Sequence, residues 1–328
     1  MARAVVTGGN GFVGSHLVDR LLRRGDEVVV FDSKGALPEP APSWTEVEYV
    51  RGSVSSPDQL AKAIRKGVDV VYHLAAVVGV DRYLESPLDV IDVNFTGTRN
   101  VLDRAAQVGA KVVFASTSEV FGKNPDVPWK EDADRILGTT SANRWSYSSS
   151  KALAEHLTFG YMRERGLNAS IVRYFNLYGP RQRPAFLVSR SVHRALRGEP
   201  PVIYDEGTQT RSFTYIDDAV DATVEIGTRP EADGECFNVG SSDEVTIREA
   251  VDLVVELTGG RVGLTSIDTR DRFGDSYQDL DRRIPDAGKI LSLLGWKSTT
   301  SLREGVGRTI EWAEESPWWL EQPENTTG

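Results

Sequence analysis

Residues 4–14 read Ala-Val-Val-Thr-Gly-Gly-Asn-Gly-Phe-Val-Gly, an apolar run of strand length that ends in a glycine-rich turn. The turn has the spacing G-x-x-G-x-x-G, and a pattern of helical period follows over Gly14–Arg24. Glycines are needed there because a pyrophosphate must approach backbone N–H groups at the N-terminus of the helix. The stretch therefore predicts a strand, a dinucleotide-binding turn and a helix.

An acidic residue ends the next apolar run, Val28–Asp32. A carboxylate at the end of this second strand can accept both hydroxyls of an adenosine ribose. Asp32 therefore favours NAD over NADP, because a 2′-phosphate would be repelled. Lys34 close by leaves NADP as the second option.

Apolar runs of strand length alternate with amphipathic segments through the first half of the chain. This alternation predicts an α/β protein with a doubly wound parallel sheet of Rossmann type. The further predicted strands are Val28–Asp32, Val68–Leu74, Lys111–Ser116 and Ala169–Tyr174, and the further predicted helices are Pro57–Lys66, Leu88–Val108 and Ser148–Arg165.

After Gly179 the alternation gives way to shorter pieces. We predict an NAD-binding Rossmann domain over residues 1–178, to which segments near 211–240 return, and a smaller C-terminal α/β lobe over residues 179–328. The tail beyond Trp312 is expected to be a last helix that frays. The elements predicted in this half are helices at Phe186–Arg197, Asp217–Gly227 and Ile247–Thr258 and strands at Val202–Tyr204 and Arg211–Tyr215.

Composition limits the class of protein. The 328 residues carry a formal net charge of −10, so we expect no nucleic-acid partner. No segment approaches the roughly 18 apolar residues that cross a bilayer, and no export signal is visible, so we expect no membrane association. The lone Cys236 and four histidines without ligand spacing predict no metal site. A reducing cytoplasm fits these features best.

Tyr147 and Lys151 are spaced i, i+4, which places both side chains on one face of a helix. A phenol with a pKa near 10 is a poor base at neutral pH unless positive charge favours the phenolate. Lys151 and an oxidised nicotinamide would both supply that charge. Thr117, at the end of a predicted strand, could hydrogen-bond the same substrate oxygen while hydride leaves the carbon for NAD.

Several motifs together resemble the extended short-chain dehydrogenase/reductase family of nucleotide-sugar epimerases, dehydratases and decarboxylases. They are TGGNGFVG at 7–14, HLAA at 73–76, VNFTGTRN at 93–100, STSEVFG at 116–122, YSSSK at 147–151, RYFNLYGPRQ at 173–182, GTQTRSFTYIDD at 207–218, FNVGSSDEVTI at 237–247 and RRIPDAGKILSLLGW at 282–296. In this family bound NAD oxidises the sugar at C4 to a ketone and is regenerated when hydride returns. The resemblance covers nearly the whole chain and implies that the lobe over residues 179–328 mainly binds the nucleotide sugar.

The resemblance implies a set of site residues. The catalytic candidates are Thr117, Tyr147, Lys151 and Glu119. The cofactor candidates are Gly8, Asn10, Gly11, Phe12, Val13, Gly14, Asp32, Ser33, Lys34, Ser53, Val54, Leu74, Ala75, Ala76, Asn94, Ser116 and Tyr174. The candidates for the UDP-sugar are Ser118, Asn176, Arg183, Val188, Arg211 and Arg283. Ser53 departs from the family, which usually has an aspartate facing the adenine.

The fate of the 4-keto sugar divides the family. The sequence of the segment Arg173–Pro180 resembles that of the epimerases, so 4-epimerisation of a UDP-hexose or UDP-hexuronate is the first expectation. Glu119 and Arg283 resemble positions of UDP-glucuronate decarboxylases, which makes decarboxylation the alternative. Dehydration ranks third because Ser118 stands where the dehydratases have an aspartate.

A scaffold that binds NAD without catalysis is a fourth hypothesis, and the joint presence of Thr117, Tyr147 and Lys151 speaks against it. Helices 88–108 and 148–165 stand where the family forms a four-helix interface. The resemblance therefore implies a homodimer.

Overall fold

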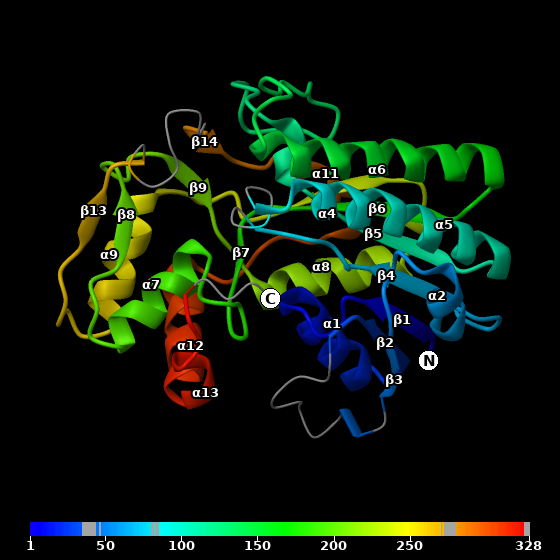
Figure 1. Cartoon of the computed structure of the whole chain (residues 1–328), viewed down its shortest axis with the longest axis horizontal. Coiled ribbons are helices and arrows are strands. Elements are labelled where there is room, and N and C mark those ends of the chain that lie inside the picture. Colours follow the sequence, from blue (N-terminus) through cyan, green and yellow to red (C-terminus); the bar gives the residue numbers. More distant parts are fainter. Residues whose placement is uncertain are drawn as a thin grey trace.

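The computed structural model describes residues 1–34, 44–45, 47–79, 82, 85–269, 271 and 280–324. A seven-stranded sheet lies at its centre, in the order β11-β6-β5-β4-β1-β2-β3, and every neighbouring pair is parallel (Figure 1). The predicted fold class is confirmed. The strands are β1 (Arg3–Thr7), β2 (Glu27–Asp32), β3 (Glu48–Arg51), β4 (Val70–His73), β5 (Lys111–Thr117), β6 (Ala169–Tyr174) and β11 (Cys236–Val239).

Helices cover both faces of this sheet, which is why its inner strands read as continuous apolar runs. Alternate residues of one strand enter different cores: Val6 packs with helices α1 (Phe12–Arg23) and α8 (Ile216–Thr228), whereas Val5 packs on the other side. The helices of that other side are α2 (Pro57–Ala63), α5 (Gly97–Val108) and α6 (Arg144–Arg165). The order of strands reverses beside β1, so the carboxyl ends of β1 and β4 flank the crevice where such sheets bind ligands.

Two predicted elements are divided in the structure, and some strands were not predicted. The predicted helix 88–108 is divided into α4 (Pro87–Ile91), a π-helical segment (Asp92–Thr96) and α5. The predicted strand 211–215 is broken at Phe213 into β9 (Thr210–Ser212) and β10 (Thr214–Tyr215), which pair with different partners. Edge strand β3 was not predicted, because it is short and only half-buried and so lacks a clear apolar run.

The later part of the chain forms small sheets and helices beside the large sheet (Figure 1). Strand β10 pairs with β7 (Leu177–Tyr178), and β9 lies between β12 (Glu244–Thr246) and β14 (Arg282–Arg283). The remaining elements are α7 (Leu187–Leu196), β8 (Val202–Tyr204), α9 (Ile247–Leu257), β13 (Thr265–Ile267), α11 (Gly288–Leu294), α12 (Leu302–Glu314) and α13 (Pro317–Leu320). Their apolar residues continue the core that α1 and α8 share.

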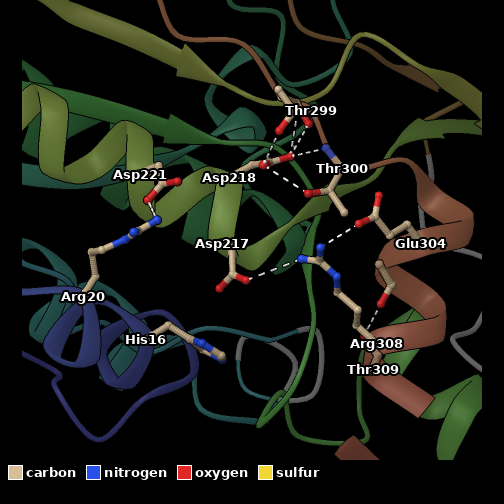
Figure 2. Close-up of polar contacts among 12 residues, drawn as sticks. His16, Arg20, Asp217, Asp218, Asp221, Thr299, Thr300, Glu304, Arg308 and Thr309 are labelled. Carbon is tan, nitrogen blue, oxygen red and sulfur yellow. Dashed lines mark hydrogen bonds and ion pairs between the residues drawn. The ribbon is translucent and has the colours of Figure 1, made fainter. Parts of the chain in front are cut away.

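A polar cluster around α8 fastens the later chain to the sheet. The buried carboxylate of Asp218 accepts hydrogen bonds from the backbone N–H groups of Thr299 and Thr300, at 3.0 and 2.9 Å, and from their hydroxyls (Figure 2). In the same view Arg308 of α12 lies between Asp217 and Glu304. The segment before α12 is thereby tied to the first turn of α8.

The tail contains a last short helix. After α12 the chain forms α13, in which Trp319 is buried with its indole N–H donating to the carbonyl of Gln182 at 2.9 Å. Trp312 packs edge-on against this ring. Residues 325–328 lie outside the described residues. Among the helices of the described ranges, none has the length and apolar character required to cross a membrane.

Candidate active site

The glycine turn between β1 and α1 is shaped for an anion. Gly8 has a φ of 72° and its carbonyl accepts a hydrogen bond from the N–H of Gly11 at 3.0 Å. Gly11 starts α1 without a capping side chain, and the first turn, which begins with Phe12 and Val13, carries no acidic residue. The helix N-terminus therefore meets the requirement of a pyrophosphate, which needs backbone N–H groups and no competing negative charge.

Asp32 lies beside this turn at the end of β2. Its carboxylate accepts hydrogen bonds from the backbone N–H groups of Asn10 and Lys34, both at 3.0 Å. Ser33 lies between Asp32 and Lys34 in the sequence. Ser53 and Val54 follow the neighbouring strand β3, where the N–H of Gly52 donates to the carbonyl of Asp32. A carboxylate held in this way fits the hydroxyls of a ribose.

The loop after β4 forms the opposite wall of the crevice. A Cβ placed on Gly8 would lie 2.8 Å from the backbone nitrogen of Ala75, so Leu74–Ala76 run directly against the turn. Asn94, in the π-helical segment, fixes the loop by accepting from the N–H of Val77 at 2.9 Å and donating to its carbonyl at 3.3 Å. These predicted cofactor residues are brought together.

Two other predicted cofactor residues direct their hydroxyls elsewhere. The hydroxyl of Ser116 donates to Glu155, and the hydroxyl of Tyr174 is 2.8 Å from that of Thr223 on α8. The polar atoms of both side chains are therefore bonded within the protein.

Lys151 is buried one helical turn after Tyr147 on α6. Its ammonium group donates to the carbonyl of Ala115 in β5 at 2.8 Å and lies 4.9 Å from the centre of the Phe114 ring. Burial lowers the pKa of Lys151 to about 7, although the carboxylate of Glu155 acts in the opposite direction. Lys151 is thus fixed in position and close to its titration point at neutral pH.

Tyr147 lies where β5 ends, near Thr117. Burial raises the pKa of its phenol above the ordinary value, and the negative charge of Glu119 adds to this rise. A hydrogen bond with Thr117 and the charge of Arg283 act in the opposite direction. The phenol therefore keeps its proton unless further positive charge comes close.

Glu119 stands at the centre of a group of arginines. Its carboxylate oxygens lie 2.6 Å from Arg283 and 3.6 Å from Arg144. Burial alone would raise the pKa of Glu119, but the guanidinium groups of Arg283, Arg144 and Arg211 outweigh it, and the pKa is lowered. Glu119 is therefore ionised at neutral pH.

Arg144 was not among the predicted site residues. It is buried and lies three residues before Tyr147, so the helical spacing that singled out Lys151 could also have identified it.

The residues predicted for the sugar nucleotide fall in three places. Ser118 is buried in the short turn that holds Glu119, and Arg211 and Arg283 are neighbours on the paired strands β9 and β14. Asn176 donates to the carbonyl of Ser212, next to Arg211, at 3.3 Å. Arg183 donates to the carbonyl of Val78, just beyond the cofactor loop, at 3.0 Å. Val188 packs within the core on α7.

Comparison with known proteins identifies the family. Residues 4–240 match the model of the NAD dependent epimerase/dehydratase family. The chain belongs to this family. Its use of NAD and the resemblance to the extended short-chain dehydrogenase/reductases are thereby confirmed.

Relatives of this epimerase/dehydratase chain carry out different reactions. It is 37% identical to a UDP-N-acetyl-alpha-D-glucosaminuronate decarboxylase of Bacillus cytotoxicus, over 95% of this chain and 98% of that protein. Its fold matches the UDP-glucose 4-epimerase of Thermotoga maritima, solved with UDP-glucose, with a TM-score of 0.87 and 29% identity over 96% and 99% of the two chains. It also matches MoeE5, solved with UDP-glucuronic acid and NAD, with a TM-score of 0.83 and 32% identity over 96% and 100%. An NAD-dependent UDP-sugar epimerase or decarboxylase fits both kinds of relative.

Metal chemistry has no candidate ligands in the described ranges. No group of three or more His, Cys, Asp or Glu side chains is arranged there to hold a metal ion. Cys236, the single cysteine, is buried in β11.

Replacing Gly14 by alanine is expected to weaken NAD binding of this epimerase/dehydratase chain at least tenfold. A Cβ at position 14 would lie 2.1 Å from the carbonyl oxygen of Gly8, so the turn must shift. Crowding of this kind also lowers the free energy of unfolding by about 1–3 kcal/mol. Calorimetric titration with NAD and urea unfolding measure the two effects.

Gly307→Ala is the matched control, because it is also a glycine within a helix and its added Cβ meets no described atom within 4 Å outside its own helix. It should bind NAD normally and gain about 0.5–1 kcal/mol in stability. Equal NAD affinity of the two variants would contradict the tight packing inferred for the turn.

Proposed function

We propose that the protein is an NAD-dependent UDP-hexuronate decarboxylase. The observation that carries this proposal is the cluster beside Tyr147, in which the single carboxylate of Glu119 faces the guanidinium groups of Arg283, Arg144 and Arg211. Guanidinium groups gathered in this way suit a sugar with a carboxylate at C6. The similarity to a glucosaminuronate decarboxylase over nearly the full length of both chains supports it.

The residues of the chain divide the proposed reaction between them. The glycine turn and Asp32 would hold NAD, which would supply the acceptor and later the donor of the C4 hydride. Tyr147 removes the proton of the C4 hydroxyl, and Thr117 hydrogen-bonds the same oxygen. The hydrogen bond with Thr117 and the charge of Arg283 lower the raised pKa of the phenol, and the positive charges of Lys151 and of the oxidised cofactor would favour the phenolate further.

Oxidation at C4 turns a hexuronate into a β-keto acid. The bond between C5 and C6 then breaks, carbon dioxide leaves, and its electron pair moves through C5 to the C4 oxygen, giving an enolate to which the protonated Tyr147 donates a hydrogen bond. A proton taken from solvent at C5 regenerates the ketone. Return of the hydride to C4 and of the Tyr147 proton to the C4 oxygen then completes a UDP-pentose. Because the pKa of Glu119 is lowered, this carboxylate acts as the charged partner of Arg283 rather than as the proton donor.

4-Epimerisation of a UDP-hexuronate or UDP-hexose is the second candidate. The sequence of the segment Arg173–Pro180 resembles that of the epimerases, and the fold similarity to a UDP-glucose 4-epimerase is high. This was the first expectation from the sequence, whereas the contact of Glu119 with Arg283 supports the proposal of decarboxylation. The same Tyr147 chemistry would form the ketone in both reactions.

The decisive experiment compares products. Purified protein is incubated separately with UDP-glucuronate, UDP-N-acetylglucosaminuronate and UDP-glucose, and the products are identified by mass and NMR. We expect loss of carbon dioxide from at least one uronate and no reaction with UDP-glucose. An unchanged mass with an inverted C4 configuration would instead establish the epimerase.

We propose that the molecule forms a homodimer through α4 and α6. These packed helices expose large apolar side chains: Leu88 at 73%, Leu153 at 51% and Phe159 at 39%. Leu153→Asp is expected to shift the sedimentation mass from dimer to monomer, because an aspartate in an apolar interface is costly to desolvate. Leu291→Asp, at an equally exposed leucine of α11, should leave the mass unchanged. A monomeric wild-type protein would disprove the dimer.

A further inference from the structure

A buried carboxylate lies behind the Tyr147–Lys151 pair. Glu155 follows Lys151 by one helical turn on α6 and is 4% exposed. Arg173 of β6 donates hydrogen bonds to both of its oxygens, from Nε at 2.9 Å and from Nη2 at 2.7 Å, and the hydroxyl of Ser116 donates to one of them. The proposed chemistry does not use this group directly.

The arginine of this pair is itself held in place. Arg173 donates through Nη1 to the carbonyl of Glu131 at 2.7 Å, and its guanidinium lies 4.9 Å from the centre of the Phe121 ring. Every hydrogen-bonding nitrogen of the guanidinium is thus directed at a named acceptor, and Glu155 has one possible orientation.

Charged and titratable groups from several elements surround this region. The negative charge of Glu155 acts to raise the pKa values of Lys151, Arg173, Arg135 and the thiol of Cys236, so its carboxylate offsets the positive charge of several groups. The other groups nearby are Glu131 beside Arg173, His73 of β4 facing Lys151, and Glu119 and Arg283 facing Tyr147.

Stability alone does not explain a buried ion pair. Replacing such a pair by apolar residues of similar volume is often neutral or stabilising, because desolvation offsets the attraction. The location supplies another reason: residues 147, 151 and 155 lie on one face of α6 at successive turns, and Ser116 is adjacent to Ala115, whose carbonyl binds Lys151. The pair and the reactive residues share the same two elements.

We propose that Glu155, fixed by Arg173 and Ser116, is a positioning residue that favours the cationic form of Lys151, one helical turn after Tyr147. The inference rests on the proposed function in so far as Tyr147 acts on the C4 oxygen. Loss of the carboxylate leaves Arg173 uncompensated, which disfavours the ammonium form of Lys151. A neutral Lys151 no longer favours the phenolate of Tyr147. The rising limb of the pH–rate profile would therefore move to higher pH.

The test compares Glu155→Gln with Asp218→Asn. Both replace a buried, hydrogen-bonded carboxylate by an amide, but Asp218 is held by Thr299 and Thr300, in contacts that do not involve Lys151. Two quantities are measured: the titration of the Lys151 amine by NMR of nitrogen-labelled lysine, assigned with Lys151→Met, and the pH profile of C4 oxidation in a single turnover with UDP-glucuronate.

In Glu155→Gln the amine is expected to titrate at lower pH than in the wild type, and the rising limb of the rate to move up by about one pH unit, a tenfold loss at neutral pH, with KM unchanged. Asp218→Asn should lower stability and move neither curve. Glu155→Asp, which keeps the charge, should restore most of the profile. Unchanged curves in Glu155→Gln, or equal shifts in Asp218→Asn, would overturn the proposal.

Glu155→Gln leaves a buried guanidinium without its partner and could prevent folding. The double variant Glu155→Gln with Arg173→Gln removes both charges, and a lowered titration of the Lys151 amine is still expected. A wild-type titration in the double variant would refute the role of Glu155. If the wild type does not oxidise UDP-glucuronate, the proposed function fails while the lysine titration still decides this inference.

Discussion

Tyr147→Phe is expected to lower turnover by roughly 10²–10⁴, the usual contribution of a positioned acid or base. The substitution removes a single oxygen, and the proposed chemistry uses that oxygen to take a proton and to return it. The ring remains on α6, so NAD binding and unfolding stability should change little. Single-turnover absorbance of reduced nicotinamide measures the first step, and product mass measures the whole cycle.

Tyr161→Phe provides the matched control. Tyr161 lies on the same helix, and its hydroxyl donates to Asp103. This variant should lose at most a small amount of stability and retain wild-type turnover. Full activity in Tyr147→Phe would remove this residue from the mechanism, whichever reaction follows the ketone.

Arg283→Met is expected to lower turnover of the uronate by about 30-fold to several thousand-fold, which corresponds to the 2–5 kcal/mol lost when one partner of a buried charged pair is removed. The substitution withdraws the guanidinium that lies 2.6 Å from Glu119 and leaves that carboxylate with less compensation. The pKa of Glu119 should then rise, since Arg283 is the largest of the charges that lower it.

The adjacent Arg282 allows a close control, because it is exposed and pairs with Glu244. Arg282→Met should leave turnover unchanged. The double variant Glu119→Gln with Arg283→Met should recover stability relative to Arg283→Met, because no unpaired charge stays buried. Wild-type turnover of a uronate by Arg283→Met would contradict the role assigned to the arginine cluster.

The pair of Glu119 and Arg283 also predicts an acid dependence of stability. A carboxyl group whose pKa is lower in the folded than in the unfolded state stabilises the fold above its unfolded pKa, and this contribution is lost as the pH falls through the folded pKa. Arg283→Met should lose less stability than the wild type over that acidic range. Urea unfolding at a series of pH values measures the difference.

Much of the fold could be predicted from the sequence because the inner strands are buried on both faces. Val5 and Val6 both enter apolar cores, so the run around them is continuous and easily found. The edge strand β3 has no such run. The π-helical turn around Asn94 has no local sequence signal, and the hydrogen bond of Asn94 with the backbone of Val77 joins residues 17 positions apart.

In the candidate site too, local spacings could be predicted from the sequence, whereas contacts between distant parts of the chain could not. The spacing of Tyr147 and Lys151 is local, and a helix converts it directly into a shared face. The ion pair of Glu119 with Arg283 depends on β14 pairing with β9, a contact between distant parts of the chain. Glu155 continues the spacing of the reactive pair, but an acidic residue in a helix resembles an ordinary solvated one until the sheet that buries it is known.

The position of β11 has a consequence for how the protein is made. This strand pairs with β6 at one end of the large sheet, yet it is the last of the seven along the chain. During synthesis β6 therefore keeps an open edge until residue 239 has left the ribosome, and an open edge can pair with other chains. Slowing translation between the codons for β6 and β11 should raise aggregation of the nascent protein, and shielding by a chaperone should matter most in that interval.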